Sequence, residues 1–489
     1  MVQEMTYSIL SLKKILFENT ELFLCARCGF IFLPCCHETC DSTYIFRKPM
    51  KTIKSIIVLT DGPFQSIMDV FINLVCATPH TAKRRSDRMI SPHGATELKP
   101  LYIDDSAERE SLLKEAESLP SLLISSPAAT AAVMMGGGYF TPLTGYMSVA
   151  DALSIADSMK LENGLFWPVP FMNIVKADQL PSSVKSGQRI ALRDPNVDGN
   201  PVLAIQEIKA IEKITEDQIA YITEKIFRTT DKNHPGVAAF TSQGDTVISG
   251  PIQVLSHSYF KTNFPDTYKT AVEIRQLITV SGWERVVAFQ TRNPMHRAHE
   301  ELCKMAKDAV NADGILIHML LGKLKKGDIP ADVRDASIRK MVELYFPPNT
   351  VHITGYGFDM LYAGPREAVL HAVFRQNAGC THLIVGRDHA GVGSYYGPFD
   401  AQEIFRKEVP KDALKIEIFE GDHTAWSKKL GKVVMMGSVP DHGKEDFLFL
   451  SGTKVRDMLA DGEPLPPEFA RPEVAKILME FYQSEKKNG

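Results

Sequence analysis

The sequence has no extreme of charge or composition. Its 489 residues carry a formal net charge of -4, and 44% of them are hydrophobic against 23% charged. These proportions exclude a disordered or fibrous chain, and the charge gives no bulk electrostatic reason to bind nucleic acid or an anionic membrane. The length corresponds to about three domains at roughly 150 residues each. We therefore expect a packed soluble protein.

Segments that would direct the chain into or across a membrane are also missing. The apolar stretch Leu22–Cys36 is too short to span a bilayer and contains Arg27. The first residues lack the basic region of a secretory signal, and the segment is not poor in acidic residues as a mitochondrial signal would be. We expect the protein to be cytoplasmic and to have no membrane partner.

Three common catalytic motifs are absent. The string closest to a phosphate-binding GxxxxGK[ST] loop, Gly437–Lys444, has one residue too many and is followed by Glu445 instead of a hydroxyl residue. No GxGxxG opens a helix after the first expected strand of the α/β region, and no GxSxG occurs. A P-loop kinase domain and a nucleophilic serine hydrolase are therefore excluded.

Cysteine is scarce after residue 88, where only Cys303 and Cys380 occur. The first 88 residues differ from the rest in charge as well, with 11 Lys or Arg against 8 Asp or Glu, whereas residues 89–489 have 44 against 51. The six other cysteines lie in the opening: Cys25, Cys28, Cys35, Cys36, Cys40 and Cys76. With His37 they could form a zinc site, or the segment could be an unstructured or untranslated extension before Met89, which we favour.

Residues 89–260 are expected to form a β-rich region. Short apolar or alternating runs predict strands at Val202–Ile205, Gln218–Ile222 and Thr246–Val254. The run Gly136–Gly138 indicates a tight turn, although a phosphate cradle is an alternative.

Apolar strands and segments of helical period alternate between residues 284 and 386. The strands are expected at Arg285–Phe289, Gly314–Leu321, Val351–Thr354 and Thr381–Val385, and the helices at Arg297–Val310, Ala331–Tyr345 and Arg366–Gln376. This alternation predicts βαβ units and a parallel sheet. Ligands bind such sheets outside the carboxyl ends of the strands, so we look for chemistry in the loops after Phe289 and Val385.

The first of these loops, QTRNPMHRAH at Gln290–His299, passes directly into a helix. The helix N-terminus offers amide donors to a phosphate, and His296 and His299 share one helical face because they are three residues apart. Arg292 adds a planar fork of donors for a tetrahedral oxyanion. We favour phosphate binding here over a metal site, because no third ligand is evident and the arginines disfavour a cation.

The second loop, GRDHAGVG at Gly386–Gly393, combines glycines that permit close backbone approach with Arg387, Asp388 and His389. A third segment, SGTKVR at Ser451–Arg456, precedes an expected helix at Val455–Leu459. Ser451 is explained as an N-cap, and Thr453 and Arg456 could also reach a nucleotide phosphate.

Taken in chain order, these loops resemble the ATP sulfurylase (sulfate adenylyltransferase) family of HxGH-type nucleotidyltransferases. The resemblance covers about Ile90–Tyr482 and includes SPHG at Ser91–Gly94 and GGGYFTPLTGYM at Gly136–Met147. It implies an α/β fold: a Rossmann-like (HUP) catalytic domain with a parallel sheet, a PUA-like β-rich N-terminal domain and a small C-terminal lobe. We place the PUA-like domain at residues 89–260, the catalytic domain at 261–430 and the C-terminal lobe at 431–489, after the extension 1–88.

The resemblance also implies a reaction and its site residues. Sulfate attacks the α-phosphate of ATP, forming adenylyl sulfate and releasing diphosphate. Sulfate would contact Gln290, Arg292 and the backbone of Ala390. The ATP contacts would be Gln290, Thr291, Arg292, Asn293, Gly386, Arg387, Asp388, His389 and the backbone near Met436. The catalytic group would be Thr291, Arg292, Asn293, His296 and His299.

Further expectations concern metals and partners. Mg²⁺ would arrive with ATP, and no structural zinc is expected near Ser427–Leu430, because no cysteine follows Cys380. We expect a homo-oligomer, taken as a dimer, with no nucleic-acid partner. The rival function is a zinc- or RNA-binding module that acts through the N-terminal region.

Overall fold

The computed structural model describes residues 15–17, 20–24, 31–32, 89–324 and 328–488, and the chain divides into two units, residues 1–76 and 77–489. In the first unit the described residues form three short antiparallel strands, β1 (Ile15–Phe17), β2 (Thr20–Leu24) and β3 (Ile31–Phe32). The cysteines of this unit, and the zinc site or extension that we considered for them, lie outside the described residues.

The N-terminal part of the second unit is built on a seven-stranded sheet with the order β4-β7-β8-β10-β5, in which β6 and β9 also pair with β10. Its strands are β4 (Ser121–Leu123), β5 (Gly145–Tyr146), β6 (Asn173–Val175), β7 (Arg189–Arg193), β8 (Val202–Glu207), β9 (Ala210–Lys213) and β10 (Thr246–Val254). Five helices accompany them: α5 (Ser106–Ser118), α6 (Ser126–Gly136), α7 (Val149–Ser158), α8 (Glu216–Phe227) and α9 (Pro235–Thr241). The strands that we predicted at Val202 and Thr246 are confirmed as β8 and β10.

The strand predicted at Gln218–Ile222 is wrong, because these residues lie within α8. Thr215 caps this helix: its side chain accepts from the Gln218 amide, and the Gln218 side chain accepts from the Thr215 amide. Such a reciprocal capping box is a helix-start signal that outweighs a short alternating run. The buried residues Ile222 and Ile226 then follow the helical spacing of four.

The tight turn predicted at Gly136–Gly138 is confirmed. Helix α6 ends at Gly136, and Gly138 has a φ of +81°, a conformation that costs glycine little. The carboxamide of Asn377 donates to the carbonyls of Tyr139 (2.7 Å) and Thr141 (3.0 Å). The motif therefore joins the N-terminal part to the helix that carries Asn377.

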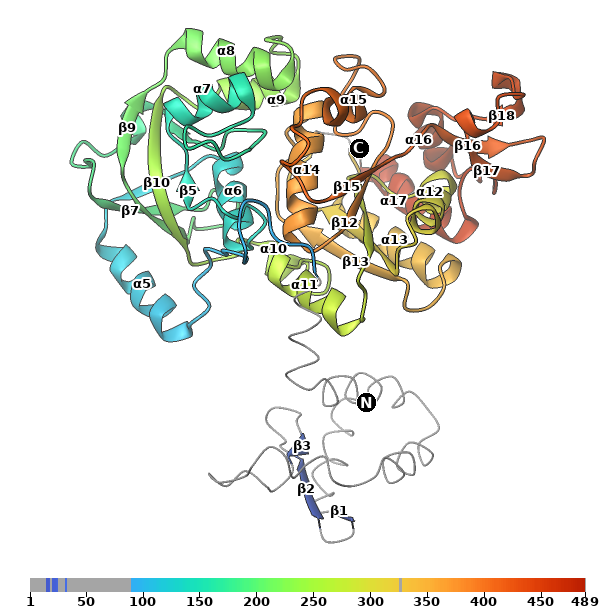
Figure 1. The fold of residues 1–489 in the computed structure, drawn as a ribbon, viewed down its shortest axis with the longest axis horizontal. Coiled ribbons are helices and arrows are strands. Elements are labelled where there is room, and N and C mark those ends of the chain that lie inside the picture. Colours follow the sequence, from blue (N-terminus) through green and yellow to red (C-terminus); the bar gives the residue numbers. More distant parts are fainter. Residues whose placement is uncertain (1–14, 18–19, 25–30, 33–88, 325–327, 489) are drawn as a thin grey trace. The chain divides into compact units, whose positions relative to one another are not determined.

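That helix packs against a five-stranded, all-parallel sheet with the order β13-β12-β11-β14-β15. The strands are β11 (Val286–Thr291), β12 (Gly314–Leu320), β13 (Val351–Tyr356), β14 (His382–Val385) and β15 (Glu417–Glu420), and the helices are α12 (Arg297–Ala309), α13 (Ala331–Tyr345), α14 (Pro365–Asn377) and α15 (Asp400–Lys407). Every element expected between residues 284 and 386 is present. Figure 1 shows α14 and α15 on one face of the sheet and α12 and α13 on the other.

The strand order reverses between β11 and β14: β12 and β13 extend to one side of β11, and β14 and β15 to the other. Crevices form at such switch points because the connecting helices leave on opposite faces. The loops after β11 and β14 are the two singled out from the sequence, and they lie at this crevice. Short helices α10 (Phe260–Asn263) and α11 (Ala271–Val280) precede β11.

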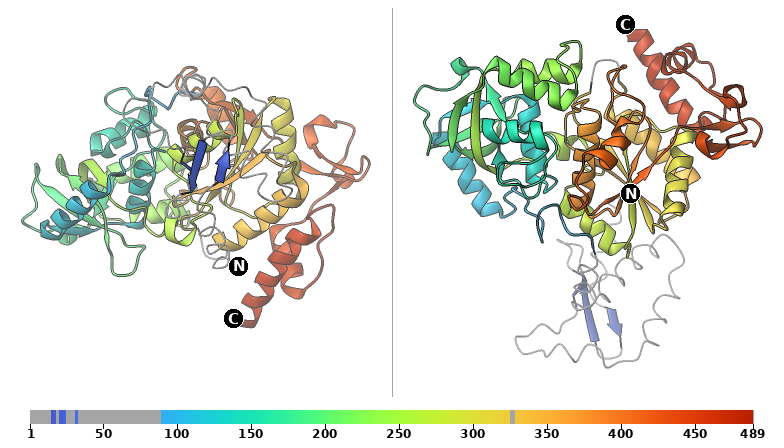
Figure 2. Two further views of the ribbon diagram at one scale, coloured as in Figure 1. Left: turned by 90° about the horizontal axis from the view of Figure 1, so that it is seen from below. Right: turned by 45° about the horizontal axis from the view of Figure 1, so that its top comes forward.

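The C-terminal segment forms a small sheet and two helices beside α12 and α13 (Figure 2). Its strands are β16 (Thr424–Ser427), β17 (Lys432–Met435) and β18 (Phe447–Leu448), and its helices are α16 (Gly452–Asp461) and α17 (Pro472–Asn488). The guanidinium of Arg471 donates twice to the fully buried carboxylate of Glu300 in α12, at 2.9 and 2.8 Å. This two-point pair fixes the C-terminal segment to the helix that follows the first loop.

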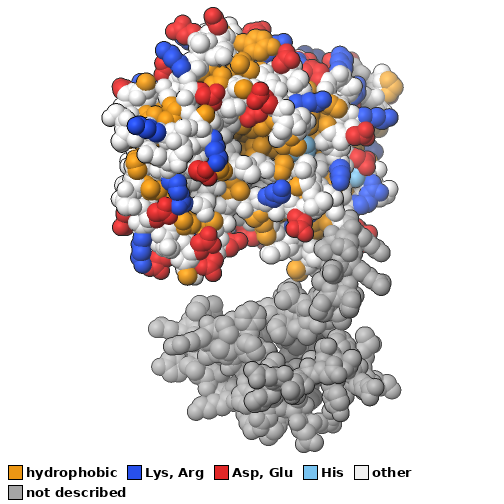
Figure 3. All heavy atoms as spheres, turned by 60° about the vertical axis from the view of Figure 1, so that its left-hand side comes forward, with side chains coloured by type: hydrophobic (Ala, Val, Ile, Leu, Met, Phe, Trp, Pro, Cys, Tyr) orange, Lys and Arg blue, Asp and Glu red, His pale blue; other side chains and the backbone are white. Residues whose placement is uncertain are grey.

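Basic and acidic side chains are interspersed on the face of the molecule drawn in Figure 3, where hydrophobic side chains gather around a hollow. Leaving the grey atoms aside, that face shows no basic stripe of the kind that RNA binding uses. Among the described residues, no helix is both long and apolar enough to cross a membrane.

Candidate active site

A polar cavity of about 290 Å³ lies at the carboxyl ends of β11 and β14. Eleven of the twelve predicted site residues line it: Gln290, Thr291, Arg292, Asn293, His296, His299, Gly386, Arg387, Asp388, His389 and Ala390. The structure thus brings together two loops that are almost one hundred residues apart in the sequence. The convergence follows from the parallel pairing of β11 with β14, which places both carboxyl ends at one edge.

Local hydrogen bonds shape the first loop before it enters α12. The Thr291 hydroxyl donates to the Asn293 carbonyl (2.7 Å) and accepts from the Asn293 amide (3.1 Å). His296 then takes the N-cap position of α12. The amide of Arg297, at the first turn of that helix, donates to the Phe469 carbonyl (3.1 Å). One of the helix amides that we expected to be open to a phosphate is therefore already occupied.

The two histidines of this loop form a stacked pair. Their ring centroids are 3.9 Å apart with an interplanar angle of 27°, and Nδ1 of His296 is buried without a partner in the described part of the chain. Burial lowers the pKa of His296 well below its ordinary value, with a further contribution from His299, and burial lowers the pKa of His299 to about 4. Both rings are therefore neutral near pH 7 and act as hydrogen-bonding groups, not as cations.

Arg292 is anchored on one side and open on the other. Its Nη2 donates to the Gly391 carbonyl (2.9 Å), and its guanidinium lies 4.9 Å from the ring centroid of Tyr362. Its Nη1 is buried and has no hydrogen-bond partner among the described residues. Arg292 lines both the polar cavity and a smaller cavity of about 200 Å³ behind it. A buried donor without an internal partner is costly, so this nitrogen marks a place for an external acceptor.

The second loop has an unusual backbone. Asp388 and Ala390 have positive φ values of 55° and 56°, which is uncommon for residues with a side chain and is concentrated at functional sites. The Ala390 carbonyl accepts from the Gly364 amide (3.1 Å), and within the described residues its own N–H makes no hydrogen bond. Ala390 thus offers one backbone donor beside Arg292.

His389 is held from behind by a second histidine. Its Nε2 lies 3.0 Å from Nδ1 of the fully buried His371. Burial is the main cause that lowers the pKa of His389 to about 3, with smaller contributions from Arg375 and Arg292. This ring is also neutral near pH 7.

Two predicted segments lie apart from the polar cavity. Met436 does not line it, and the Met436 amide donates to the His423 carbonyl (2.8 Å). Ser451 caps α16 as expected, by accepting from the Lys454 amide (3.1 Å). Arg456 lines a neighbouring cavity of about 410 Å³ that shares His296 and His299 with the polar one, whereas Thr453 lines neither.

Sequence reasoning missed three polar lining residues, Asp422, His423 and Thr424. They follow β15, so the rule that led to the other two loops also applies to them. We did not predict β15, because its four residues are only partly buried or exposed and give a weak apolar pattern. Asp422 accepts from the Gly437 amide (2.5 Å) and the His423 amide (2.6 Å).

The histidine of the SPHG motif has a structural position. His93 is buried, its amide donates to Asn377 (2.8 Å), and its Nε2 lies 2.7 Å from the Phe166 carbonyl. Neither His93 nor Gly136–Gly138 lines the polar cavity. Both motifs fasten the N-terminal part to α14.

Fold and site together define an α/β nucleotide-binding protein whose ligand crevice lies at the switch point of a parallel sheet. Residues 265–481 match the model of the ATP-sulfurylase family, and residues 90–257 match that of a PUA-like domain. The chain is 66% identical over 396 residues to a sulfate adenylyltransferase of Alcanivorax borkumensis, covering 81% of this chain and 98% of that protein. It is 63% identical, over 81% and 99% of the two chains, to a sulfate adenylyltransferase of Allochromatium vinosum. The chain belongs to the ATP-sulfurylase family.

A solved structure of a hexameric APS kinase from Thiobacillus denitrificans is similar in fold. It matches with a TM-score of 0.62 at 24% identity, over 80% of this chain and 68% of that one. The PUA-like N-terminal domain and the parallel-sheet catalytic domain expected from the sequence are both confirmed.

Proposed function

We propose that this chain is a sulfate adenylyltransferase that works through the polar cavity between the loops after β11 and β14. A sulfate oxygen attacks the α-phosphorus of ATP, the bond from that phosphorus to the bridging oxygen of the β-phosphate breaks, and diphosphate leaves with the electron pair. The observation that carries this proposal is the convergence of eleven of the residues named by the family resemblance on one cavity.

Sulfate would bind at Arg292, Gln290 and the Ala390 amide. Arg292 Nη1 is a buried donor in need of an acceptor, and the N–H of Ala390, which lines the same cavity, makes no hydrogen bond within the described residues. Binding here matters because sulfate and ATP repel each other: two unit charges 4 Å apart cost about 4 kcal/mol at an effective dielectric near 20. The fixed charge of Arg292 would offset that repulsion.

ATP would lie along Gln290–Asn293 and Gly386–His389, and Met436 stays a prediction for the adenine contact. The neutral rings of His296 and His299 would donate hydrogen bonds to the oxygens of the α-phosphate as charge accumulates there. Sulfate is already ionised, so no general base is needed, and positioning plus charge stabilisation would supply the catalysis.

Mg²⁺ would enter as part of the substrate MgATP. The cavity is rich in donors, and its two carboxylates are engaged, Asp388 with Arg387 (3.3 Å) and Asp422 with backbone amides. Among the described residues, no three His, Cys, Asp or Glu side chains form a group that could hold a metal. These donors suit phosphate oxygens, and the phosphates would carry the ion. Ser427–Leu430, where we predict no zinc, covers the last residue of β16 and the start of the turn to β17.

We also keep as proposals a division at residues 88, 260 and 430, a cytoplasmic location and a homodimer. The proposed division at residue 430 falls within the turn between β16 and β17, which includes residues 430 and 431. Neither the family matches nor the relatives' names favour the rival zinc- or RNA-binding function.

The test is sulfate-dependent release of diphosphate from MgATP by the full chain and by His296→Ala. We expect activity in the wild type and a loss of about a hundredfold or more in kcat for the variant, the usual effect of removing one donor to transition-state charge. The matched control is His352→Ala, since His352 lies in β13, outside the cavity, next to Ser281 and Trp283. A wild type that adenylates phosphomonoesters but not sulfate would overturn the proposal.

A further inference from the structure

Gln290 reaches the cavity on a flexible side chain that is held at a single point. Its Nε2 donates to the hydroxyl of Tyr356 (3.2 Å), and this is the one side-chain hydrogen bond of Gln290 within the described residues. A glutamine amide carries two donors on one end and an acceptor on the other, so a rotation of the amide would present its carbonyl oxygen to an anion. Whatever fixes this amide therefore decides whether Gln290 attracts or repels an oxyanion.

Tyr356 is itself immobilised by the sheet and the core. It is the last residue of β13, it pairs with Leu320 of β12, and its side chain is fully buried. Its ring centroid lies 4.6 Å from that of His318 and 6.0 Å from that of Phe374. The hydroxyl consequently reaches Gln290 from across an intervening strand, at a position that the fold sets.

Arg375 lies against the ring of Tyr356. Its guanidinium is 4.7 Å from the ring centroid, and the side chain is fully buried. Its Nη1 donates to the His371 carbonyl (3.3 Å), while Nε and Nη2 have no partner among the described residues. A buried cation gains from an aromatic face, so Arg375 holds the ring in place and contributes positive charge behind the cavity.

We propose that Tyr356 is a positioning residue for the oxyanion: its hydroxyl holds the Gln290 amide with an N–H available to sulfate, and Arg375 supports its ring. The inference rests on the proposed function. Because the bond is made before substrate arrives, it lowers the cost of ordering the glutamine side chain on binding. ATP, which has many other contacts to the two loops, should depend on it far less.

The test compares Tyr356→Phe with Tyr139→Phe in the full chain, with separate KM values for sulfate and MgATP. Tyr139 is a matched control because it is also fully buried, its ring lies 5.6 Å from that of His318, and its hydroxyl bonds to the Lys269 carbonyl and His318 instead of Gln290. Each variant loses one buried hydroxyl. We expect Tyr356→Phe to raise the KM for sulfate about fivefold to tenfold, the equivalent of one hydrogen bond, with a change under twofold for MgATP, and Tyr139→Phe to change neither.

A double-mutant cycle with Gln290→Ala tests whether Tyr356 acts through Gln290. On that background, Tyr356→Phe should cause no further rise in the KM for sulfate. Any of three results would overturn the proposal: equal rises in the two KM values for Tyr356→Phe, an unchanged KM for sulfate in that variant, or full additivity of the two substitutions in the cycle.

A second variant, Gln290→Asn, changes no residue of the buried core, so it tests the proposal even if Tyr356→Phe does not fold. The amide of Gln290→Asn is one methylene shorter and cannot reach Tyr356, and it should behave like Gln290→Ala. Retention of the wild-type KM for sulfate would overturn the proposal. A wild type without sulfate-dependent diphosphate release would instead reject the proposed function, so the two failures are distinguishable.

Discussion

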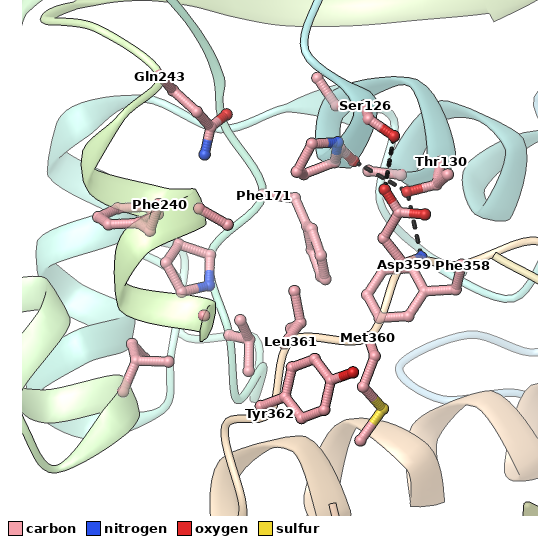
Figure 4. Close-up of a pocket in the computed structure, with 18 of the residues that line it drawn as sticks. Ser126, Thr130, Phe171, Phe240, Gln243, Phe358, Asp359, Met360, Leu361 and Tyr362 are labelled. Atoms are coloured by element: carbon pink, nitrogen blue, oxygen red, sulfur yellow. Dashed lines mark hydrogen bonds between the residues drawn. The ribbon is translucent and has the colours of Figure 1, made fainter. Parts of the chain in front are cut away.

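Two cavities of similar size meet at Met360 and differ in their lining. The polar cavity of about 290 Å³ holds the loops after β11 and β14, whereas a cavity of about 330 Å³ on the other side is lined mainly by apolar residues such as Phe171, Phe240 and Leu361. Figure 4 shows these side chains around the apolar cavity, with Met360 at its edge. Volume alone does not separate a functional site from a packing space.

The state of the polar groups does separate them. In the apolar cavity the buried carboxylate of Asp359 accepts from Ser126 Oγ (2.6 Å), as Figure 4 shows. It also accepts from the Lys323 amide (2.8 Å), so both of its oxygens are engaged. In the polar cavity, Arg292 Nη1 and His296 Nδ1 are buried without partners. Since native proteins satisfy most buried polar groups, an unsatisfied polar group that also lines a cavity, as these two do, indicates where a ligand can complete the structure.

The largest expected effect comes from the guanidinium of the polar cavity. Arg292→Lys keeps the positive charge but loses the planar guanidinium, in which Nη2 binds the Gly391 carbonyl while Nη1 stays available to an anion. We expect kcat/KM for sulfate to fall about a hundredfold or more, with thermal unfolding close to wild type. Steady-state kinetics and a melting curve would check this, and near-normal kinetics would show that charge alone suffices.

Removing an aromatic ring from the apolar cavity should have the opposite signature. Phe171 is 7% exposed, and its ring centroid lies 4.3 Å from that of Phe140. Phe171→Ala should lower the free energy of unfolding by about 3 kcal/mol through lost burial and an enlarged cavity, while kcat and both KM values stay within twofold. Urea unfolding and steady-state kinetics on the same preparation would check this. A fall in activity without a fall in stability would show that the apolar cavity has a role in function.

The two cavities should also respond oppositely to pH. The folded pKa of His299 is lowered by burial to about 4, so the unfolded chain takes up its proton first and stability is lost as pH falls below about 6.5. Burial raises the pKa of the Asp359 carboxyl in the folded protein. Its contribution to the free energy of unfolding is therefore present at low pH and lost as the pH rises through the folded pKa. His299→Asn should therefore reduce the stability loss between pH 7.5 and 5 by about 1–2 kcal/mol. Urea titrations at both pH values would test this, and an unchanged loss would place the acid sensitivity elsewhere.

The smallest expected effect is that of filling the apolar cavity. Ala131, 1% exposed, lines it from α6. Ala131→Leu should stabilise the protein by about 1 kcal/mol or less, because cavity filling gains burial but risks strain, and activity should not change. A calorimetric scan can detect this shift, and a clear loss of sulfate-dependent activity would mean that the two cavities are coupled across Met360.

Much of the catalytic region was predictable because its signals are local. Parallel strands buried on both faces give continuous apolar runs, and α13 begins and ends at the predicted residues. The error at Gln218–Ile222 came from reading alternation without the capping box at Thr215. Asp422–Thr424 escaped notice because β15 is short and partly exposed. Met436 lies outside the polar cavity, and its adenine contact stays a prediction because its segment has little pattern of its own.

The sequence alone was enough to predict which loops meet at one edge of the sheet, since the order of strands and helices predicts a parallel sheet and the sheet predicts the edge where ligands bind. Only the tertiary structure decided the state of the groups in those loops. Burial by α12, α14 and the C-terminal segment makes His296, His299 and His389 neutral, and a contact across an intervening strand gives Gln290 its partner in Tyr356. Desolvation and distant contacts depend on what packs around a residue, and neither is written in the spacing of a motif.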